Sequence, residues 1–224
     1  MLRKRSDREL LEAWRQGDKA AGDQLFERYY DKVLKFFRNK VSTEVKDLVQ
    51  QTFAACVEGR DRLEFKEDTS FRSYLFGVAH NLLRSHLRRR YRNDREVEFD
   101  KVSIQDLAPG PSSIIVKHRE ERLLLEALRR LPLEHQVMLE LRFWEDMKTR
   151  EIASVLEVPH ATARTRLRRA LQLLEQKLEE LADSTALLAS TRENLEKWAS
   201  SIWKRMNGAT PYMYGITPYS DITK

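Results

Sequence analysis

Four arginines lie within one short segment of this chain: Arg164, Arg166, Arg168 and Arg169. A guanidinium is a planar fork of N–H donors, which suits phosphates and the edge of guanine. Apolar residues recur through the same segment at helical spacing, at Ala163, Leu167, Ala170, Leu171 and Leu174, and predict one buried helix face. At about 100° per residue, Thr165, Arg168 and Arg169 fall on the opposite, solvent-facing side.

The residues just before this segment predict a shorter helix followed by a turn. Residues 149–156 have helical apolar spacing, and residues 157–159 turn the chain. A short helix, a tight turn and a second helix with a basic outer face are typical of a helix-turn-helix, whose second helix lies in the DNA major groove. The alternative is an amphipathic helix whose arginines simply face solvent.

A second basic cluster lies upstream, at Arg84, Arg88, Arg89, Arg90, Arg92 and Arg95. Residues 1–95 hold 22 Lys and Arg against 15 Asp and Glu, whereas residues 96–181 hold 14 against 16. The basic excess is therefore N-terminal. Two separated basic helices favour a single polyanion that is contacted at two points.

The composition of the 224 residues predicts an all-α protein, because the chain holds only seven glycines and six prolines and its apolar spacing is helical nearly throughout. No apolar run is long enough to span a bilayer, and the basic N-terminus lacks the apolar stretch of a signal peptide. The single cysteine, Cys56, is expected in the core, and the five histidines show no ligand spacing. We therefore expect no membrane insertion, no metal site and a reducing cytoplasm.

The chain divides into four predicted segments. Residues 1–95 form a first helical domain, and residues 119–181 form a smaller second domain that contains the helix-turn-helix. Residues 96–118 are acidic, include a Pro-Gly-Pro turn and predict a flexible linker that reaches roughly 70 Å at about 3.3–3.6 Å per residue. A passive spacer explains the linker's composition equally well. Residues 182–224 form a C-terminal helical extension of open role.

Several blocks in this order resemble the sigma factors of bacterial RNA polymerase, of the small extracytoplasmic-function group (group IV). The first block is Asp47-Leu-Val-Gln-Gln-Thr-Phe53. In the family this helix docks on the clamp helices of the polymerase core, which implies a polymerase-binding set of Asp47, Leu48, Gln50, Gln51 and Phe53. Gln51 stands where the family usually has Glu, so we expect weaker docking. Periodicity alone allows Leu48 and Phe53 to be core residues.

The second block, residues 71–90, resembles the family segment that captures the melted non-template strand of the minus-ten promoter element, together with the loop at residues 63–70. Tyr74 replaces the usual Trp, and Ser85 stands where Asp is common. The resemblance implies a minus-ten set of Phe65, Tyr74, Asn81, Ser85, Arg88 and Arg89. Phe71 lies on the apolar stripe and is expected in the core.

The third block comprises residues 131–143, Glu151-Ile-Ala153 and the arginine-bearing helix. The family uses it to read the minus-thirty-five element as duplex, which implies DNA contacts from Arg164, Thr165, Arg168 and Arg169. Glu157 occupies the turn where Gly is usual. A non-Gly residue in a left-handed turn costs about 1–2 kcal/mol, so a reshaped turn is expected.

The resemblance implies a promoter-specificity subunit that has no catalytic site and no cofactor. Its expected partners are the RNA polymerase core, promoter DNA and an anti-sigma protein. One alternative is a stand-alone helix-turn-helix transcriptional regulator. A second is an enzyme such as a recombinase, but no constellation of nucleophile and carboxylates supports it.

The C-terminal extension lies outside the family pattern. Its stripe of Leu188, Leu195, Trp198 and Ile202 predicts either packing back on the second domain or a docking and autoinhibitory segment anchored by Tyr212, Tyr214 and Tyr219.

Overall fold

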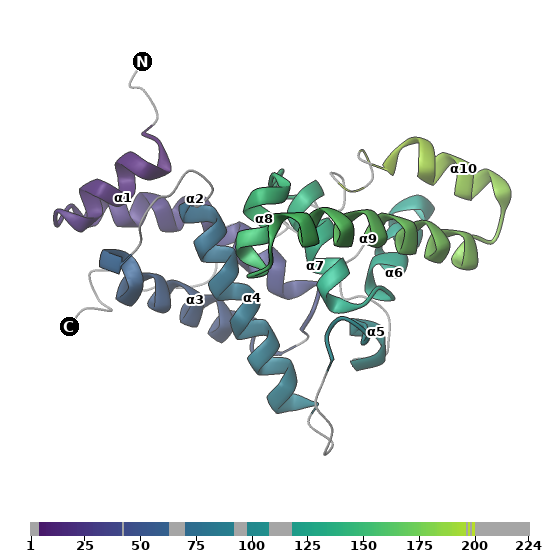
Figure 1. Cartoon of the computed structure of the whole chain (residues 1–224), viewed down its shortest axis with the longest axis horizontal. Helices are drawn as coiled ribbons and strands as arrows, with labels where there is room; N and C mark the ends of the chain where they lie inside the picture. The colour runs from purple at the N-terminus through teal and green to yellow at the C-terminus, as the bar shows by residue number, and fades with distance from the viewer. Residues whose placement is uncertain are drawn as a thin grey trace.

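The computed structural model describes residues 5–41, 43–62, 70–91, 98–107 and 118–195, together with residues 197 and 199. Over these residues the chain is helical and contains no β-strand, only an isolated bridge between Ser103 and Pro132. The predicted all-α class is therefore confirmed. The N-terminal helices lie at one end of an elongated molecule and the C-terminal helices at the other (Figure 1).

Four helices form the N-terminal half: α1 (Asp7–Arg15), α2 (Lys19–Arg38), α3 (Val45–Gly59) and α4 (Phe71–Arg90). A 3-10 turn, Arg60–Arg62, follows α3. Serine caps fix two of the starts, because Ser6 accepts a hydrogen bond from the backbone N–H of Glu9 and Ser70 accepts one from that of Ser73. Capping places the beginning of α4, the helix that carries Arg84, Arg88, Arg89 and Arg90 of the upstream basic cluster.

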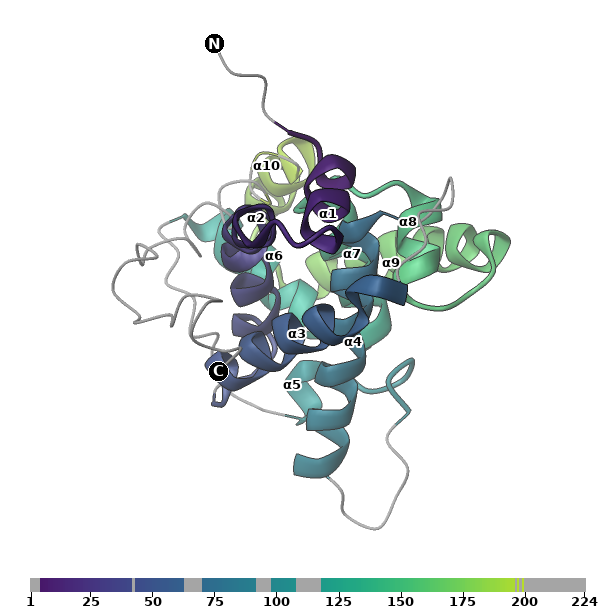
Figure 2. The same ribbon diagram turned by 90° about the vertical axis from the view of Figure 1, so that its left-hand side faces the viewer.

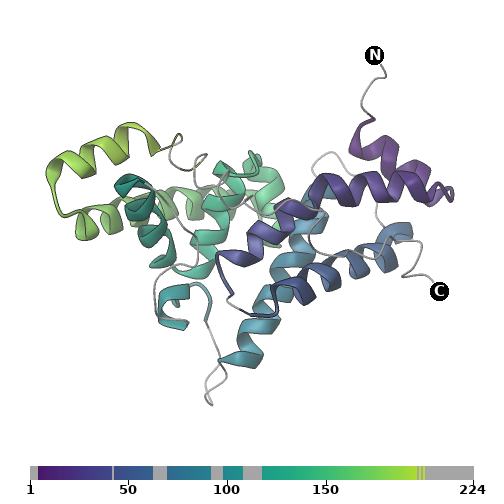
Figure 3. The same ribbon diagram turned by 180° about the vertical axis from the view of Figure 1, so that it is seen from behind.

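The C-terminal half holds α6 (Arg119–Arg129), α7 (Leu133–Phe143), α8 (Thr149–Val155), α9 (His160–Leu181) and α10 (Thr185–Glu193). The predicted helix-turn-helix corresponds to α8 and α9. Seen from behind, α10 lies at the far end of the molecule from α1, where it packs against α6 (Figure 3).

One hydrophobic core crosses the boundary between the two predicted domains. It includes α1 to α4, with Trp14, Phe37 and Phe71 at most 1% exposed. The same core continues into α7 and α8, where Val137 and Ile152 are fully buried. The end-on view places α4 beside α8 (Figure 2). The two halves are therefore packed together in this structure.

A second core lies between α6, α9 and the far face of α7, and the C-terminal extension covers part of it. Thr191 of α10 is fully buried, Leu188 and Leu195 pack against this core, and the hydroxyl of Ser190 donates to Glu120 of α6 at 3.0 Å. The described part of the extension thus packs back on the second domain, as the simpler alternative predicted. The tyrosines proposed as anchors, and Trp198 and Ile202, lie outside the described residues.

Part of the predicted linker is folded, which differs from the expectation of a flexible spacer. Residues 98–107 include α5 (Ile104–Leu107), and Phe99 and Ile104 are at most 3% exposed. The carbonyl of Val102 accepts a hydrogen bond from the backbone N–H of Leu133 at 3.0 Å, and that of Phe99 accepts one from Glu134 at 3.2 Å. Two buried apolar side chains and these backbone bonds hold this stretch against both halves.

A buried ion pair joins the chain just after α2 to α7. The Lys40 ammonium contacts the Glu140 carboxylate, and both side chains are at most 2% exposed. Glu140 also accepts hydrogen bonds from the amides of Asn39 and Gln136, each at 2.8 Å. Burial lowers the pKa of Lys40, and the neighbouring Glu140 opposes that shift. The pair is stable only because each charge has its partner.

Glu140→Gln is expected to destabilise the fold by about 3–5 kcal/mol, because it leaves the Lys40 ammonium buried without a counter-charge. Urea denaturation followed by circular dichroism measures the loss. The matched control is Asp146→Asn, which removes a 95% exposed carboxylate paired with Arg142 and is expected to change stability by less than about 0.5 kcal/mol. Equal stability of the two variants would contradict a structural role for the buried pair.

Candidate nucleic-acid interface

The outer face of α9 carries the predicted duplex-reading residues. Arg164, Thr165, Arg168 and Arg169 are all exposed, as their spacing predicts. The hydroxyl of Thr165 donates to the carbonyl of Ala161 at 3.2 Å, which leaves its oxygen able to accept a further hydrogen bond. Arg166 is only half-exposed and does not belong to this face.

The inner face of α9 matches the predicted stripe except at one residue. Ala163, Ala170 and Leu174 are buried, and Leu167 is half-buried against both cores. Leu171 is 40% exposed, so its predicted place in the core is wrong. It follows Ala170 by one residue and lies about 100° further round the helix, at the edge of the buried stripe.

The turn between α8 and α9 keeps the left-handed form although Glu stands in place of Gly. Glu157 has φ 53°, and the backbone N–H of Val158 donates to the carbonyl of Ala153 at 3.0 Å. The predicted reshaping of the turn at this residue is therefore wrong. The local structure imposes the conformation despite its steric penalty.

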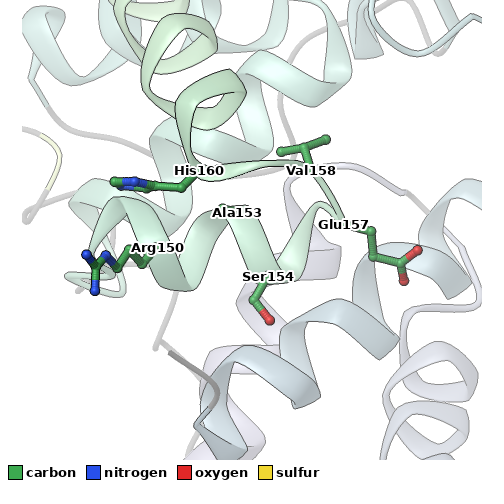
Figure 4. A pocket seen from close by; sticks show the side chains of 6 residues that line it. All are labelled: Arg150, Ala153, Ser154, Glu157, Val158 and His160. Atoms are coloured by element: carbon green, nitrogen blue, oxygen red, sulfur yellow. The ribbon is translucent and has the colours of Figure 1, made fainter. Parts of the chain in front are cut away.

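Arg150, Ser154 and His160 line an open hollow between α8 and α9, together with Glu157. Arg150 and His160 lie on the same side of the hollow, whereas Glu157 points away from them (Figure 4). Arg150 and His160 are both exposed, and neither was predicted from the sequence. Arg150 lies in the first turn of α8 and His160 in the first turn of α9. Because backbone N–H groups at helix starts favour anions, these positions could have indicated the two residues from the sequence.

The predicted strand-capturing face lies on α4. Asn81, Ser85, Arg88 and Arg89 are all exposed. The Arg88 guanidinium lies 5.4 Å from the centre of the Phe99 ring, so the folded linker segment orients it by a cation–π contact. A row of amide, hydroxyl and guanidinium groups on one helix can hydrogen-bond base edges and hold phosphates.

The aromatic residues predicted for strand capture differ in accessibility. Phe65 lies outside the described residues. Tyr74 is half-buried and packs over Gly59 at the end of α3, where an added Cβ would lie 2.1 Å from its hydroxyl oxygen. Burial raises the pKa of Tyr74, and Phe71 is fully buried beside Tyr29. Tyr74 is therefore partly covered by α3, and its role in stacking stays a prediction.

The candidate polymerase-docking surface lies on α3. Asp47, Gln50 and Gln51 are exposed, but Leu48 and Phe53 are 2% and 8% exposed. The Phe53 ring packs against Phe26 at a centroid distance of 4.7 Å. Leu48 and Phe53 therefore belong to the core and position the helix, and the exposed polar residues remain as the candidate contact surface.

The candidate strand-capturing face of α4 contacts the turn that precedes α9. The side-chain amide of Asn81 on α4 donates to the carboxylate of Glu157, in the turn before α9, at 3.1 Å.

The single cysteine, Cys56, is fully buried, and burial raises the pKa of its thiol to about 12. The described residues hold no cluster of candidate metal ligands, and none of their helices has the length and apolar character to cross a bilayer.

Two family descriptions match this chain in the order of its two halves. Sigma-70 region 2 matches residues 25–93, and Sigma-70, region 4, matches residues 121–174. The chain belongs to the extracytoplasmic-function sigma factors of bacterial RNA polymerase. This sigma factor is thus a promoter-specificity subunit that directs transcription initiation.

Similar proteins extend the match beyond the two regions. The sigma factor is 25% identical over 190 residues to the ECF RNA polymerase sigma-E factor of Haemophilus influenzae, covering 81% of this chain and all of that protein. It is 26% identical over 185 residues to the sigma-E factor of Escherichia coli, covering 79% and 96%.

Two solved structures share the fold. The structure of CnrH in complex with the cytosolic domain of CnrY has a TM-score of 0.54 at 23% identity and covers 79% of this chain and 99% of CnrH. The sigma factor RpoE of Bartonella quintana, solved with the anti-sigma factor NepR, has a TM-score of 0.52 at 19% identity and covers 71% and 97%.

Arg168→Ala and Arg169→Ala are each expected to weaken promoter binding of the polymerase complex by about 1–3 kcal/mol where the guanidinium reads a base. Where the guanidinium contacts a phosphate, the negative slope of log affinity against log salt becomes smaller in magnitude by about 0.9. Lys177→Ala, further along the same helix, is the control. Fluorescence anisotropy across a salt series separates the two cases. Wild-type affinity and slope in both arginine variants would exclude this face.

Proposed function

We propose that three exposed surfaces of this sigma factor divide promoter recognition between them. The α9 face reads the minus-thirty-five element as duplex, the α4 face holds the melted non-template strand of the minus-ten element, and the α3 surface binds the polymerase clamp helices. The observation that carries the proposal is the pair of exposed basic faces on α4 and α9, one in each segment that matches a sigma-70 region.

Duplex recognition is assigned to Arg164, Thr165, Arg168 and Arg169. A straight helix with these side chains on one face fits the major groove, where guanine offers two acceptors to one guanidinium. Arg150 and His160 extend the same surface and would contact the flanking backbone phosphates.

Strand capture is assigned to Asn81, Ser85, Arg88 and Arg89, with Phe65, which lies outside the described residues, as the stacking residue. Unpairing a base costs a few kcal/mol, whereas each base stacked on an aromatic ring regains about 1–3 kcal/mol. Groups that bind the open strand better than the duplex shift the equilibrium toward melting. Tyr74 stays in the proposal as the residue that fixes the start of α4 against α3.

Polymerase docking is assigned to Asp47, Gln50 and Gln51, the exposed residues of the first family block. Leu48 and Phe53 support them from the core. All bond-making chemistry then belongs to the polymerase, in the cytoplasm where it works, and this chain carries no catalytic step of its own.

An anti-sigma protein is a further proposed partner. RpoE is described in complex with the anti-sigma factor NepR, and CnrH with the cytosolic domain of CnrY. A partner of this kind would have to cover the α3 surface or the two DNA faces in order to silence transcription.

Transcription by purified core polymerase on a genomic DNA pool, with the initiated RNAs sequenced, tests the function as a whole. New start sites that share two upstream sequence elements are expected only when the chain is added. Tight, sequence-specific duplex binding without polymerase, together with no new start sites, would favour the stand-alone regulator instead.

Asn81→Ala is expected to slow promoter opening about tenfold, a loss of about 1.4 kcal/mol, because the open strand loses one amide contact. Binding of core polymerase is expected to stay unchanged. A fluorescent base analogue in the minus-ten element reports the opening rate, and polymerase binding is measured in parallel. An unchanged opening rate would remove Asn81 from the capture face.

Gln51→Glu is expected to strengthen binding to core polymerase severalfold, because it restores the charge that the family surface usually carries at this position. The gain should diminish as salt rises, since exposed charge interactions are screened. Gln172→Glu adds the same charge on α9 and is the control for polymerase affinity, which competition against a labelled sigma factor measures. Weaker binding by Gln51→Glu would place the docking surface elsewhere.

A further inference from the structure

An apolar groove lies where α6, α7 and α9 meet over the second core. Its walls include Leu124 and Leu128 of α6, Phe143 and Trp144 at the end of α7, and Leu174 of α9. Two residues of the C-terminal extension, Leu195 and Ala199, complete the lining. The groove is therefore already in contact with a segment of its own chain.

The α10 helix brings the extension to this groove and is bonded to both α6 and α9. The hydroxyl of Ser190 donates to Glu120 of α6 at 3.0 Å, and the Arg192 guanidinium pairs with Glu175 and Glu179 of α9. Thr191, between them, is fully buried. Exposed ion pairs contribute little to stability, so most of the stabilisation comes from apolar packing.

The described residues beyond α10 show which side of the extension faces the groove. Residues 195, 197 and 199 are helical, and Leu195 is half-buried and Ala199 buried, whereas Lys197 between them is exposed. At about 100° per residue, a helix that continues in this register places Trp198, Ile202 and Met206 with Leu195 and Ala199, and Ser200, Ser201 and Lys204 with Lys197. The apolar side of this amphipathic pattern is the groove side.

Charge is also complementary between this segment and the helix beside the groove. Residues 195–206 hold three bases and one acid, whereas residues 172–181, the second half of α9, hold three acids and one base. The sign of the charge therefore favours docking of the segment along α9.

The covered part of α9 belongs to the same rigid helix as the DNA-facing arginines. Leu174 and Leu178 are at most 3% exposed in the second core. Arg168 lies six residues before Leu174, about 9 Å along the helix at about 1.5 Å per residue. Sigma-70, region 4, matches the chain only as far as residue 174. The extension thus adds packing under α9 that the matched region does not contain.

We propose that residues 195–206 form an amphipathic helix that docks in this groove of its own chain, with Trp198 and Ile202 as anchors. This C-terminal cover holds α9 in the position from which its arginines read DNA. The docking concerns the free chain alone, whereas the positioning of α9 rests on the proposed function of its outer face.

Trp198→Glu combined with Ile202→Glu in the full chain tests the docking. The uncovered groove is expected to bind 1-anilinonaphthalene-8-sulfonate and to raise its fluorescence about threefold or more. Ser200→Glu combined with Ser201→Glu adds the same two carboxylates to the other side of the segment, and its fluorescence should equal that of the wild type. A synthetic peptide of residues 195–206 should reverse the increase by occupying the groove.

Equal fluorescence of the two double variants would overturn the docking, as would a peptide that leaves the increase unchanged. Size-exclusion chromatography with light scattering tests a different occupant. A wild-type dimer that the Trp198 and Ile202 substitutions dissociate would show that the segment docks on a second copy, which contradicts a cover formed within one chain.

Promoter binding tests the positioning of α9. With core polymerase, the Trp198 and Ile202 double variant is expected to bind promoter DNA about tenfold more weakly, the effect of one misplaced bidentate contact. The salt slope should stay at the wild-type value, because no phosphate contact is removed. Binding to core polymerase should not change, and the peptide should restore promoter affinity.

Wild-type promoter affinity in this double variant would exclude the positioning role. If the wild-type chain itself binds no promoter with polymerase, the proposed function fails instead, and the fluorescence measurement still decides the docking.

Discussion

The packing of α4 against α8 is the contact on which the arrangement of both halves depends. It joins an N-terminal core to side chains of α7 and α8, so that Ile152 and Val155 are buried by residues of another domain. Exposing two such aliphatic side chains costs about 1.5–3 kcal/mol each. The contact between the halves therefore contributes several kcal/mol to the arrangement in which α4 and α9 present their exposed basic faces.

Basic residues of this sigma factor fall into two groups. Exposed arginines on α4 and α9 have no acidic partner among the ion pairs that the described residues form and are available to phosphates. Lys32 of α2 and Arg72 and Arg84 of α4 are instead paired with Glu145, Glu151 and Glu134 of the C-terminal half. The same excess of N-terminal positive charge therefore supports both DNA binding and the contact between the halves. The folded linker segment adds to this, because the guanidiniums of Arg84 and Arg88 each lie 5.4 Å from the centre of the Phe99 ring.

Sequence reasoning predicted the helical class, the helix-turn-helix and the exposed face of α9, because each depends on local periodicity. It did not predict the contact between the halves. The charge counts showed a basic N-terminal half and an acidic middle, but counts do not pair Arg72 with Glu151 across 79 residues. The same limit explains Leu48, Phe53 and Tyr74. The family pattern assigned these residues to binding, whereas tertiary packing buries Leu48 and Phe53 in the core and half-buries Tyr74. Glu157 kept its left-handed turn, in which the backbone N–H of Val158 bonds the carbonyl of Ala153, although the residue type disfavours that conformation.

Footprinting of one promoter, located beforehand by sequencing initiated RNAs, tests most directly whether one chain contacts DNA both paired and unpaired. With core polymerase and this chain together, the upstream element should be protected from cleavage as duplex, and thymines of the downstream element should become reactive to permanganate. Both signals should vanish when either protein is omitted. An upstream footprint made by the chain alone, with no permanganate reactivity whether or not polymerase is present, would contradict the account.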